Sequence, residues 1–513
     1  MSIDTSKLDN SVRVRFPPSP TGDPHIGLVR SALFNYAFAR HYGGKLVLRI
    51  EDTDAARNTE ESYLAILNTL RWAGIEWDEG PEVGGEFGPY RQSERGEIYA
   101  EMAARLEKDG RAYPCYCTAE ELEAAREKAT AEKRAPGYEG TCRNLTAEQI
   151  AAYEAEGRTH VLRFRMPEDR TLAWDDVVRG EISFESVNVP DYVLVRADGS
   201  PLYTLVNPVD DALMGITHVL RGEDLLSSTP RQLPLHEALV EMGVSKQVPA
   251  FGHLPFVMGE GNKKLSKRDP EASFSYYPRT GYLPEGLVNY LALLGWSLGG
   301  DEEIFSIEEL IAGFDGTRIS ANPARFDPKK CAAINAVHLR KLGTEDLAKR
   351  ILPFLDREGL LLGREGHLAN DEEWATLLAA VPLVQERMTV LSESIGMLGF
   401  LFTGDGTDAR HAFQVNEDDA AKVLTADSWP TLAAAAAALE GLAEWTTSAI
   451  DEALRTALIE GLGLKPKNAF TPVRVAVTGR RVSPPLFESI ELLGRERTLA
   501  RLRAADAKAR AAA

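Results

Sequence analysis

The sequence predicts an α/β domain with a parallel sheet, an α+β insertion within that domain, and an all-α C-terminal region. Three patterns support this prediction: a strand–helix–strand unit near the N-terminus, short alternating segments between residues 161 and 206, and nearly continuous helical patterning beyond Pro284. Parallel strands joined by a helix bind ligands at their carboxyl ends, so the first unit also predicts where a site lies.

The strand–helix–strand unit begins with Val12–Phe16, which alternates apolar and basic residues as a strand does. The loop PPSPTGDPHIG follows, and Ile26–His41 then places apolar residues on one helical stripe. Gly43–Gly44 ends this helix, and Lys45–Ile50 is a second strand that runs into the sequence EDTD. The crossover implies that the two strands are parallel neighbours.

The pattern in the middle of the chain predicts an insertion, followed by a further strand of the parallel sheet. Thr118–Lys133 is patterned as a charged, exposed helix, and Val161–Val206 contains the short alternating runs VLRFR, ISF, DYVLVR and LYTLV. Ile216–Asp224 is patterned as a core strand that ends in charged residues, and a helix is expected near Pro230–Met242. The remainder beyond Pro284 is rich in Ala, Leu and Glu, which favours helices.

Length, charge and cysteine content exclude several classes of protein. The 513 residues suggest about three domains. The net charge of −19 argues against a polybasic nucleic-acid coat, although an acidic protein can still carry a basic patch. Four cysteines exclude a disulfide scaffold, and no segment has the pattern of a secretory signal or a membrane span. We therefore expect a cytoplasmic protein with no membrane partner.

Two motifs carry phosphate-binding chemistry. His25 and Gly27 stand at the start of the first crossover helix, where free N–H groups and the helix dipole favour anions. Lys263–Arg268 is a cationic loop suited to binding phosphates. Taken singly, the His25 and Gly27 motif is explained equally well as a turn with a helix cap. The Lys263–Arg268 segment taken singly is explained as a solvated loop. Their occurrence together, about 240 residues apart, favours one shared site.

These motifs resemble those of the class I aminoacyl-tRNA synthetases, and within them the glutamyl-tRNA synthetases of the bacterial type. RFPPSPTGDPHIG is similar to the first signature of the family and KLSKR to the second. In the family's order, RIEDTD, DEGP, GPYRQSER, LYTLVNPVDDALMGITHVLRGEDL, STPRQ, LPEGLVNYLALLGW and FDPKK resemble further segments. Leu28 replaces the second histidine of the first signature, as is usual in this branch.

The resemblance implies a domain order. An α/β Rossmann-type catalytic domain is expected in two halves, at residues 11–115 and 206–253, around an α+β insertion at 116–205 that grips the acceptor end of tRNA. A stem-contact region with the KLSKR loop is expected at 254–340, and an all-α anticodon-binding domain at 341–513.

The resemblance also implies a two-step reaction. L-glutamate attacks the α-phosphorus of ATP to give glutamyl-adenylate, and the acyl group then passes to the 2′-hydroxyl of the terminal adenosine of tRNA. Such chemistry needs positioning and charge neutralisation, and Mg²⁺ is expected to accompany ATP. The expected catalytic residues are His25, Gly27, Lys264 and Lys267, and ATP is expected to contact His25, Asp224, Val257, Lys264, Leu265, Ser266, Lys267 and Arg268.

Charged residues at the strand ends complement a glutamate substrate. Arg15 and Arg221 are expected to bind its side-chain carboxylate, because paired guanidinium hydrogen bonds give orientation as well as energy. Glu51 supplies the negative charge for the ammonium. The family places Ser19, Tyr203 and Asn207 in the same pocket.

The cysteines resemble a zinc site of some family members. Cys115, Cys117 and Cys142 have the spacing of that site, but Asn144 stands where those members carry histidine. Tyr138 or water would be the fourth ligand. The alternative is a vestigial site of small buried residues, and the isolated Cys331 is expected to be structural.

The C-terminal segment 464–513 contains 11 Lys or Arg and four acidic residues, which favours phosphate contacts. By resemblance, the helical region reads the anticodon of tRNA(Glu). Whether tRNA(Gln) is also charged is left open, with Arg387 as a candidate reader. A monomer is the family norm, and the family usually activates glutamate only with tRNA present.

The sequence disfavours three other classes of protein. Glutaminyl-tRNA synthetases end in β-barrels, which the helical C-terminal pattern and Arg221 disfavour. The short glutamyl-queuosine relatives have no anticodon domain, and this chain is too long. A non-catalytic tRNA-binding paralogue is disfavoured because both signatures are intact.

Overall fold

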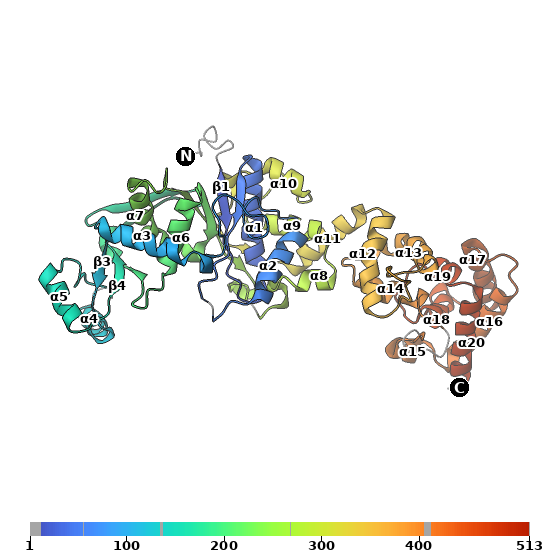
Figure 1. The fold of residues 1–513 in the computed structure, drawn as a ribbon. Helices are drawn as coiled ribbons and strands as arrows, with labels where there is room; N and C mark the ends of the chain where they lie inside the picture. The colour runs from blue at the N-terminus through green and yellow to red at the C-terminus, as the bar shows by residue number, and fades with distance from the viewer. Residues whose placement is uncertain (1–11, 55, 134–136, 267, 405–411, 512–513) are drawn as a thin grey trace. The chain divides into compact units, whose positions relative to one another are not determined.

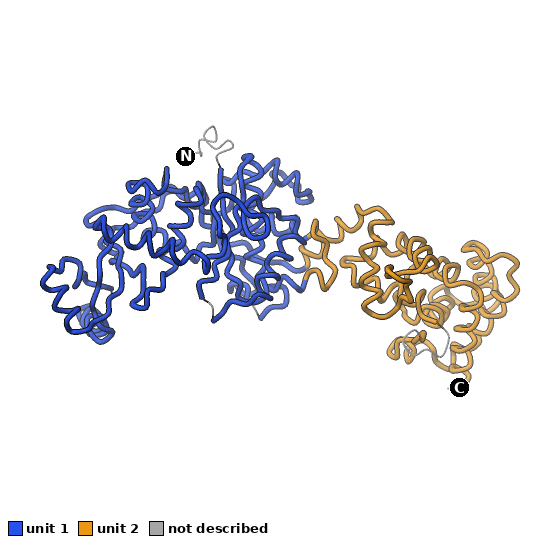
Figure 2. The backbone as a smooth tube through the Cα atoms, viewed as in Figure 1, with its two compact units in different colours: residues 1–276, 287–328 blue, residues 277–286, 329–513 orange. Residues whose placement is uncertain are grey.

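The computed structural model describes residues 12–54, 56–133, 137–266, 268–404 and 412–511. The chain divides into two compact units. Unit 1 comprises Met1–Tyr276 and Leu287–Pro328, and unit 2 comprises Tyr277–Gly286 and Lys329–Ala513 (Figure 2).

A four-stranded parallel sheet forms the centre of unit 1, in the order β2-β1-β8-β9 (Figure 1). The chain leaves β1, crosses through α1 to β2 on one side, and returns much later as β8 on the other side. The strand order therefore reverses at β1, and such a reversal opens a crevice at the carboxyl ends of the strands. The bounds are β1 (Arg13–Phe16), α1 (Ile26–His41), β2 (Lys45–Leu48), β8 (His218–Gly222) and β9 (Ala250–Leu254).

Helix α1 has the bounds that the apolar stripe predicts. Ile26, Val29, Leu33 and Phe34 are buried on it, and the helix packs against β1 and β8. The side chain of His25 caps its N-terminus, which fixes where the helix begins.

The segment expected to be the insertion, together with β3 just before it, forms two small antiparallel sheets with exposed helices (Figure 1). One sheet has the order β3-β4-β7, and the other is the hairpin β5–β6. The hairpin reaches the central sheet, because the N–H of Val177, in its turn, donates to the carbonyl of Phe251 in β9 (2.8 Å). The bounds are β3 (Ala112–Cys115), α4 (Ala119–Ala131), α5 (Ala147–Ala155), β4 (Val161–Phe164), β5 (Thr171–Asp176), β6 (Gly180–Glu185) and β7 (Val193–Val195).

One prediction of a strand is wrong. The run LYTLV belongs to helix α6 (Tyr203–Leu213) rather than to the alternating segments of the insertion. Leu205, Val206, Val209 and Ala212 are buried at helical spacing, so packing overrides the β-propensity of the first few residues.

The other elements of unit 1 surround the sheet. The strand β10, which precedes the KLSKR loop, pairs in parallel with β11. The bounds are α2 (Glu60–Trp72), α3 (Gly96–Lys108), α7 (Thr229–Glu241), β10 (Val257–Met258), α10 (Ile307–Gly313) and β11 (Ala324–Arg325), with α8 (Tyr276–Thr280), α9 (Pro284–Leu293) and α11 (Pro328–Lys341) crossing the unit boundaries.

The described residues of unit 2 form helices joined by loops and turns, with isolated β-bridges and no named strand, which confirms the all-α prediction. Its core includes Leu347, Val381, Leu432, Val473 and Leu502 from five helices. No described helix is long and apolar enough to cross a bilayer. The bounds are α12 (Thr344–Arg357), α13 (Asp371–Val384), α14 (Glu393–Leu398), α15 (Glu417–Val423), α16 (Trp429–Glu440), α17 (Thr447–Arg455), α18 (Pro466–Thr478), α19 (Leu486–Leu493) and α20 (Arg495–Ala511).

Many basic residues of the C-terminal segment are used inside unit 2. Arg495 donates to the carbonyl of Leu442 (2.6 Å), and the buried Arg501 donates to that of Val477 (2.8 Å). Others form ion pairs: Arg481 with Asp419, Arg503 with Glu440 and Arg510 with Asp506. The charge counted along the sequence therefore overstates the cations available to phosphates.

Candidate active site

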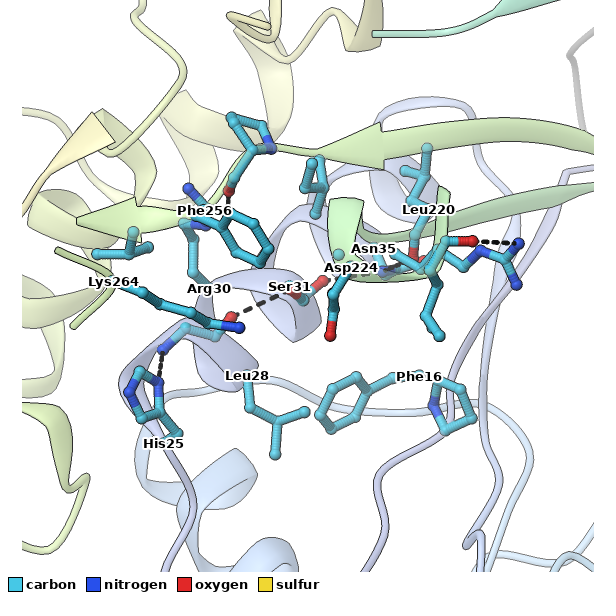
Figure 3. Close-up of a pocket in the computed structure, with 18 of the residues that line it drawn as sticks. Phe16, His25, Leu28, Arg30, Ser31, Asn35, Leu220, Asp224, Phe256 and Lys264 are labelled. Atoms are coloured by element: carbon cyan, nitrogen blue, oxygen red, sulfur yellow. Dashed lines mark hydrogen bonds between the residues drawn. The ribbon is translucent and has the colours of Figure 1, made fainter. Parts of the chain in front are cut away.

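A cavity of about 390 Å³ opens at the carboxyl ends of β1, β8 and β9 (Figure 3). The reversal of strand order at β1 places it there. Ten of the expected site residues line it: Arg15, His25, Gly27, Glu51, Tyr203, Arg221, Asp224, Val257, Lys264 and Leu265.

Four other expected residues that the structure describes lie outside this lining. Ser19 is exposed in the loop after β1, and Asn207 is buried behind Glu51. Ser266 and Arg268 are exposed, and the Ser266 hydroxyl accepts from the Arg268 N–H (3.2 Å). Lys267 lies outside the described residues.

His25 has a defined protonation pattern. Its Nδ1 accepts from the N–H of Gly27 (3.0 Å), so the ring proton lies on Nε2. Nε2 faces the carbonyl oxygen of Leu265 at 3.3 Å. An added Cβ at Gly27 would lie 3.2 Å from Nδ1, which is tight enough to disturb this cap. The motif thus presents one N–H donor beside the start of α1.

The KLSKR segment folds back on the strand before it. The N–H of Leu265 donates to the carbonyl of Val257 (3.1 Å), and Met258 bridges to Lys264. The ammonium of Lys264 lies 4.2 Å from the centre of the Phe256 ring, a cation–π contact. In Figure 3 the side chains of Lys264 and Asp224 extend into the cavity from two sides.

Arg30 holds the wall of the cavity and was not predicted from the sequence. It donates from Nη1 to the carbonyl of Leu294 (2.8 Å) and from Nη2 to that of Pro255. Burial lowers its pKa to about 10. The sequence feature that could have indicated its role is the position of this arginine among the apolar residues of the first helix.

The acidic side of the cavity is Glu51, which follows β2. It accepts a hydrogen bond from the amide of Asn207, and Arg49 lies 3.8 Å away. Burial raises the pKa of Glu51, against the opposing effect of Arg49 and Asn207. The carboxylate is therefore a desolvated acceptor, suited to a cation.

Arg15 and Arg49 share the carboxylate of Asp211. Arg15 Nε lies 3.2 Å from it and Arg49 Nη1 2.8 Å. Burial raises the pKa of Asp211, but the two guanidiniums outweigh burial and hold that pKa below its usual range. Nη1 of Arg15 is buried with no hydrogen-bond partner among the described residues. Because buried donors are normally paired, this group is available to an anion in the cavity.

Arg49 and Asp211 were not predicted from the sequence. Arg49 is completely buried and also donates to Oδ1 of Asn207 (2.8 Å), which turns the amide nitrogen of Asn207 toward Glu51. The only signals were an arginine in an apolar strand and an acidic pair in the run that forms α6.

Arg221 is a buried cation with neutral hydrogen-bond partners. It donates to Gln232 (2.8 Å), Thr229 (2.7 Å) and His253 (3.2 Å) and also to the carbonyl of Leu225 (3.3 Å). Within the described part of the chain it contacts no carboxylate, and burial lowers its pKa. A carboxylate in the cavity would offset this desolvation.

The three cysteines of the insertion meet as their spacing suggests. The sulfurs of Cys115, Cys117 and Cys142 lie within 4.8 Å of one another. Tyr138 approaches them, with its hydroxyl 3.5 Å from the Cys115 sulfur. Asn144 instead accepts a hydrogen bond from Arg165 (3.3 Å). Cys331 is buried on α11.

Comparison with known proteins identifies the family of the chain. The family described as "tRNA synthetases class I (E and Q), catalytic domain" matches residues 11–333, and "Anticodon binding domain" matches residues 346–506. The chain thus has the catalytic and anticodon-binding domains of a class I aminoacyl-tRNA synthetase.

Similarity to individual proteins is more specific. The chain is 58% identical over 495 residues to a glutamate–tRNA ligase of Nocardioides, covering 96% of this chain and 98% of that one. It is also 58% identical over 496 residues to that of Saccharopolyspora erythraea, covering 97% and 96%. A crystal structure of a glutamate tRNA ligase from Elizabethkingia meningosepticum in complex with its amino acid superposes with a TM-score of 0.81 at 32% identity, covering 97% and 99%.

The chain therefore belongs to the glutamate–tRNA ligase family. It attaches glutamate to tRNA in protein synthesis, and ATP is a substrate. These findings confirm the resemblance found in the sequence.

Proposed function

We propose that the cavity binds L-glutamate at its Arg15, Glu51 and Arg221 end and ATP at its His25 and Lys264 end. Two buried guanidiniums carry this proposal. Among the described residues, Nη1 of Arg15 has no hydrogen-bond partner and Arg221 has only neutral partners. Two carboxylates and one ammonium match two cations and one anion.

In this proposal the glutamate ammonium pairs with Glu51, and Arg221 receives the side-chain carboxylate. Arg15 reaches the substrate through Nη1 while Asp211 holds its Nε. Tyr203, at the start of α6, closes the pocket between them. Asn207 acts through Glu51, with which it shares a hydrogen bond. We place Ser19 at the pocket only by family resemblance.

ATP occupies the side formed by α1 and the KLSKR loop. A carboxylate oxygen of glutamate attacks the α-phosphorus, and the bond to pyrophosphate breaks. Nε2–H of His25 and the Lys264 ammonium stabilise the negative charge that develops on the phosphates. Gly27 lets the phosphates approach the start of α1.

Further residues complete the proposed ATP site. Asp224, Val257 and Leu265 line the ATP side. Lys267, Ser266 and Arg268 stay proposed ATP contacts on the family pattern, and Mg²⁺ enters as a partner of the ATP phosphates. In the second step, the 2′-hydroxyl of tRNA attacks the acyl carbon and AMP leaves.

ATP–pyrophosphate exchange tests this assignment. We expect exchange to depend on L-glutamate, and comparison with and without tRNA shows whether activation requires tRNA. Exchange supported equally by an amino acid without a side-chain carboxylate would contradict the proposed pocket.

We also propose that the cysteine cluster holds Zn²⁺. Three thiol sulfurs within 4.8 Å fit three ligand positions of a tetrahedral site. Tyr138 or water would take the fourth position. Burial raises the pKa of the Tyr138 hydroxyl, so its ligation requires the metal to displace the proton. Zinc would brace the insertion that contacts the acceptor end of tRNA.

We assign recognition of the tRNA anticodon to unit 2. Arg387 is held by the carbonyl of Ser483 (2.7 Å), and Arg474 donates to the hydroxyl of the same residue (2.7 Å). We propose that Arg387 reads the anticodon of tRNA(Glu). Aminoacylation of purified tRNA(Glu) and tRNA(Gln) side by side tests whether tRNA(Gln) is also charged.

The same proposal includes a monomer that acts in the cytoplasm. The monomer is proposed on the family norm, and it is consistent with a single chain bringing ten expected site residues to one cavity. Sedimentation at working concentration tests the monomer.

A further inference from the structure

A buried Asp–His pair lies behind Arg221, outside the residues assigned to the reaction. His253 on β9 is fully buried, and Asp176 at the end of β5 is 2% exposed. A single hydrogen bond of 2.5 Å joins Nδ1 of His253 to Oδ2 of Asp176. Asp176 comes from the hairpin of the insertion, so two parts of unit 1 meet here.

The other ring nitrogen of His253 faces Arg221. The two residues are register partners on the neighbouring parallel strands β8 and β9. Nε of Arg221 lies 3.2 Å from Nε2 of His253, and the hydroxyl of Thr229 lies 3.0 Å from the same nitrogen. Thr229 also accepts from Nη2 of Arg221.

The donors and acceptors fix one form of the imidazole. An ionised carboxylate only accepts, so Nδ1 must carry the ring proton and Nε2 must be the acceptor for Arg221. Burial lowers the pKa of His253, although Asp176 opposes this effect, and the ring is therefore neutral. A proton on Nε2 would place a donor against the N–H of Arg221.

The position of Asp176 is itself fixed by the backbone. Its Oδ1 accepts from the N–H groups of Val178, Arg179 and His253, each at 3.1 Å. Trp174 donates to Oδ2 (3.2 Å). The carboxylate can therefore hold the imidazole in one orientation, and the imidazole holds the guanidinium.

We propose that Asp176 and His253 are positioning residues that aim Arg221 at the side-chain carboxylate of glutamate. The inference rests on the proposed role of Arg221. It makes the insertion hairpin a contributor to amino-acid selection as well as a part of the tRNA-binding insertion. Preorganised hydrogen-bond direction is what lets a buried guanidinium distinguish a carboxylate from an amide.

A double-mutant cycle tests this proposal. The variants are His253→Leu, Arg221→Leu and the double variant, measured by kcat/KM for glutamate in aminoacylation at saturating ATP and tRNA. We expect His253→Leu to lower this value about tenfold, because a buried charged donor loses its acceptor. In the Arg221→Leu background, His253→Leu should cause no further loss.

Asp176→Asn provides a second test with little change of shape. Its Oδ1 can still accept the three backbone N–H groups, but its NH₂ then faces Nδ1 of His253. The imidazole must move its proton to Nε2, against Arg221. We expect kcat/KM for glutamate to fall and KM for ATP to stay within about twofold. His218→Leu is the matched control, a buried histidine on β8 whose ring contacts Thr217.

Each outcome decides the question. Unchanged glutamate kinetics in folded Asp176→Asn, or additive losses in the double variant, would overturn the positioning role while leaving the role of Arg221 intact. An unchanged kcat/KM for glutamate in Arg221→Leu alone would overturn the assignment of Arg221 and this inference with it. If His253→Leu fails to fold, Asp176→Asn carries the test.

Discussion

His25 and Leu265 are 240 residues apart in the chain, and Nε2 of His25 lies 3.3 Å from the carbonyl oxygen of Leu265. The contact joins the two signature motifs at one wall of the cavity. Because Nδ1 is occupied by the N–H of Gly27, the group that faces Leu265 is an N–H donor. In the proposed ATP site, this N–H is the donor that His25 offers to a phosphate oxygen.

Lys264→Ala should slow glutamyl-adenylate formation by about 10²–10³-fold. The variant loses one preorganised positive charge that stabilises the negative charge developing on the phosphates. The measurement is single-turnover activation with tRNA present. Lys263→Ala is the control, since Lys263 is an exposed neighbour outside the cavity lining. Equal rates for the two variants would remove Lys264 from the mechanism.

Arg221→Leu should lower kcat/KM for glutamate by about 30-fold to several thousand-fold, because a buried carboxylate loses its guanidinium partner. Charging with glutamine should not rise to match, since no contact with an amide is created. KM for ATP should change much less. Equal losses for glutamate and ATP would indicate a general structural role instead.

The raised pKa of Glu51 leads us to expect that glutamate binding depends on pH. Burial raises its pKa, so the carboxylate gains a proton at a higher pH than an ordinary glutamate and loses its attraction for the substrate ammonium. KM for glutamate should therefore rise as the pH falls, and this rise should begin above the pH range in which an ordinary glutamate takes up its proton. Glu51→Gln can still accept from Asn207 but cannot titrate, so its KM should be higher and its pH profile flatter. An equally steep profile in Glu51→Gln would assign the effect to another group.

The cysteine cluster predicts about one zinc per chain by elemental analysis. Cys142→Ser should lower that content, because one of the three sulfur ligands is lost. Cys331→Ser should leave it unchanged, since Cys331 lies on α11 and the cluster is in the insertion. A metal-free and fully active preparation would support the vestigial interpretation.

Local patterns determined much of this protein. The apolar stripe predicted the bounds of α1, and ten of the residues expected at the site from motifs and family resemblance line the cavity. These features are readable because periodicity and loop chemistry depend on near neighbours in the chain. The run LYTLV was misread for the same reason: its local β-propensity was overridden by burial along α6.

Only the tertiary structure decided which buried charges are paired. Arg49 meets Asp211 from α6, and His253 meets Asp176 from the insertion hairpin. In the sequence these are isolated polar residues within apolar strands or acids in a helix. Burying a charge is tolerable only when a partner and hydrogen bonds arrive with it, and that partner comes from a distant segment. The sequence therefore determined the elements and the chemistry of the motifs, whereas the fold decided how each guanidinium is held and which of its donors faces the cavity.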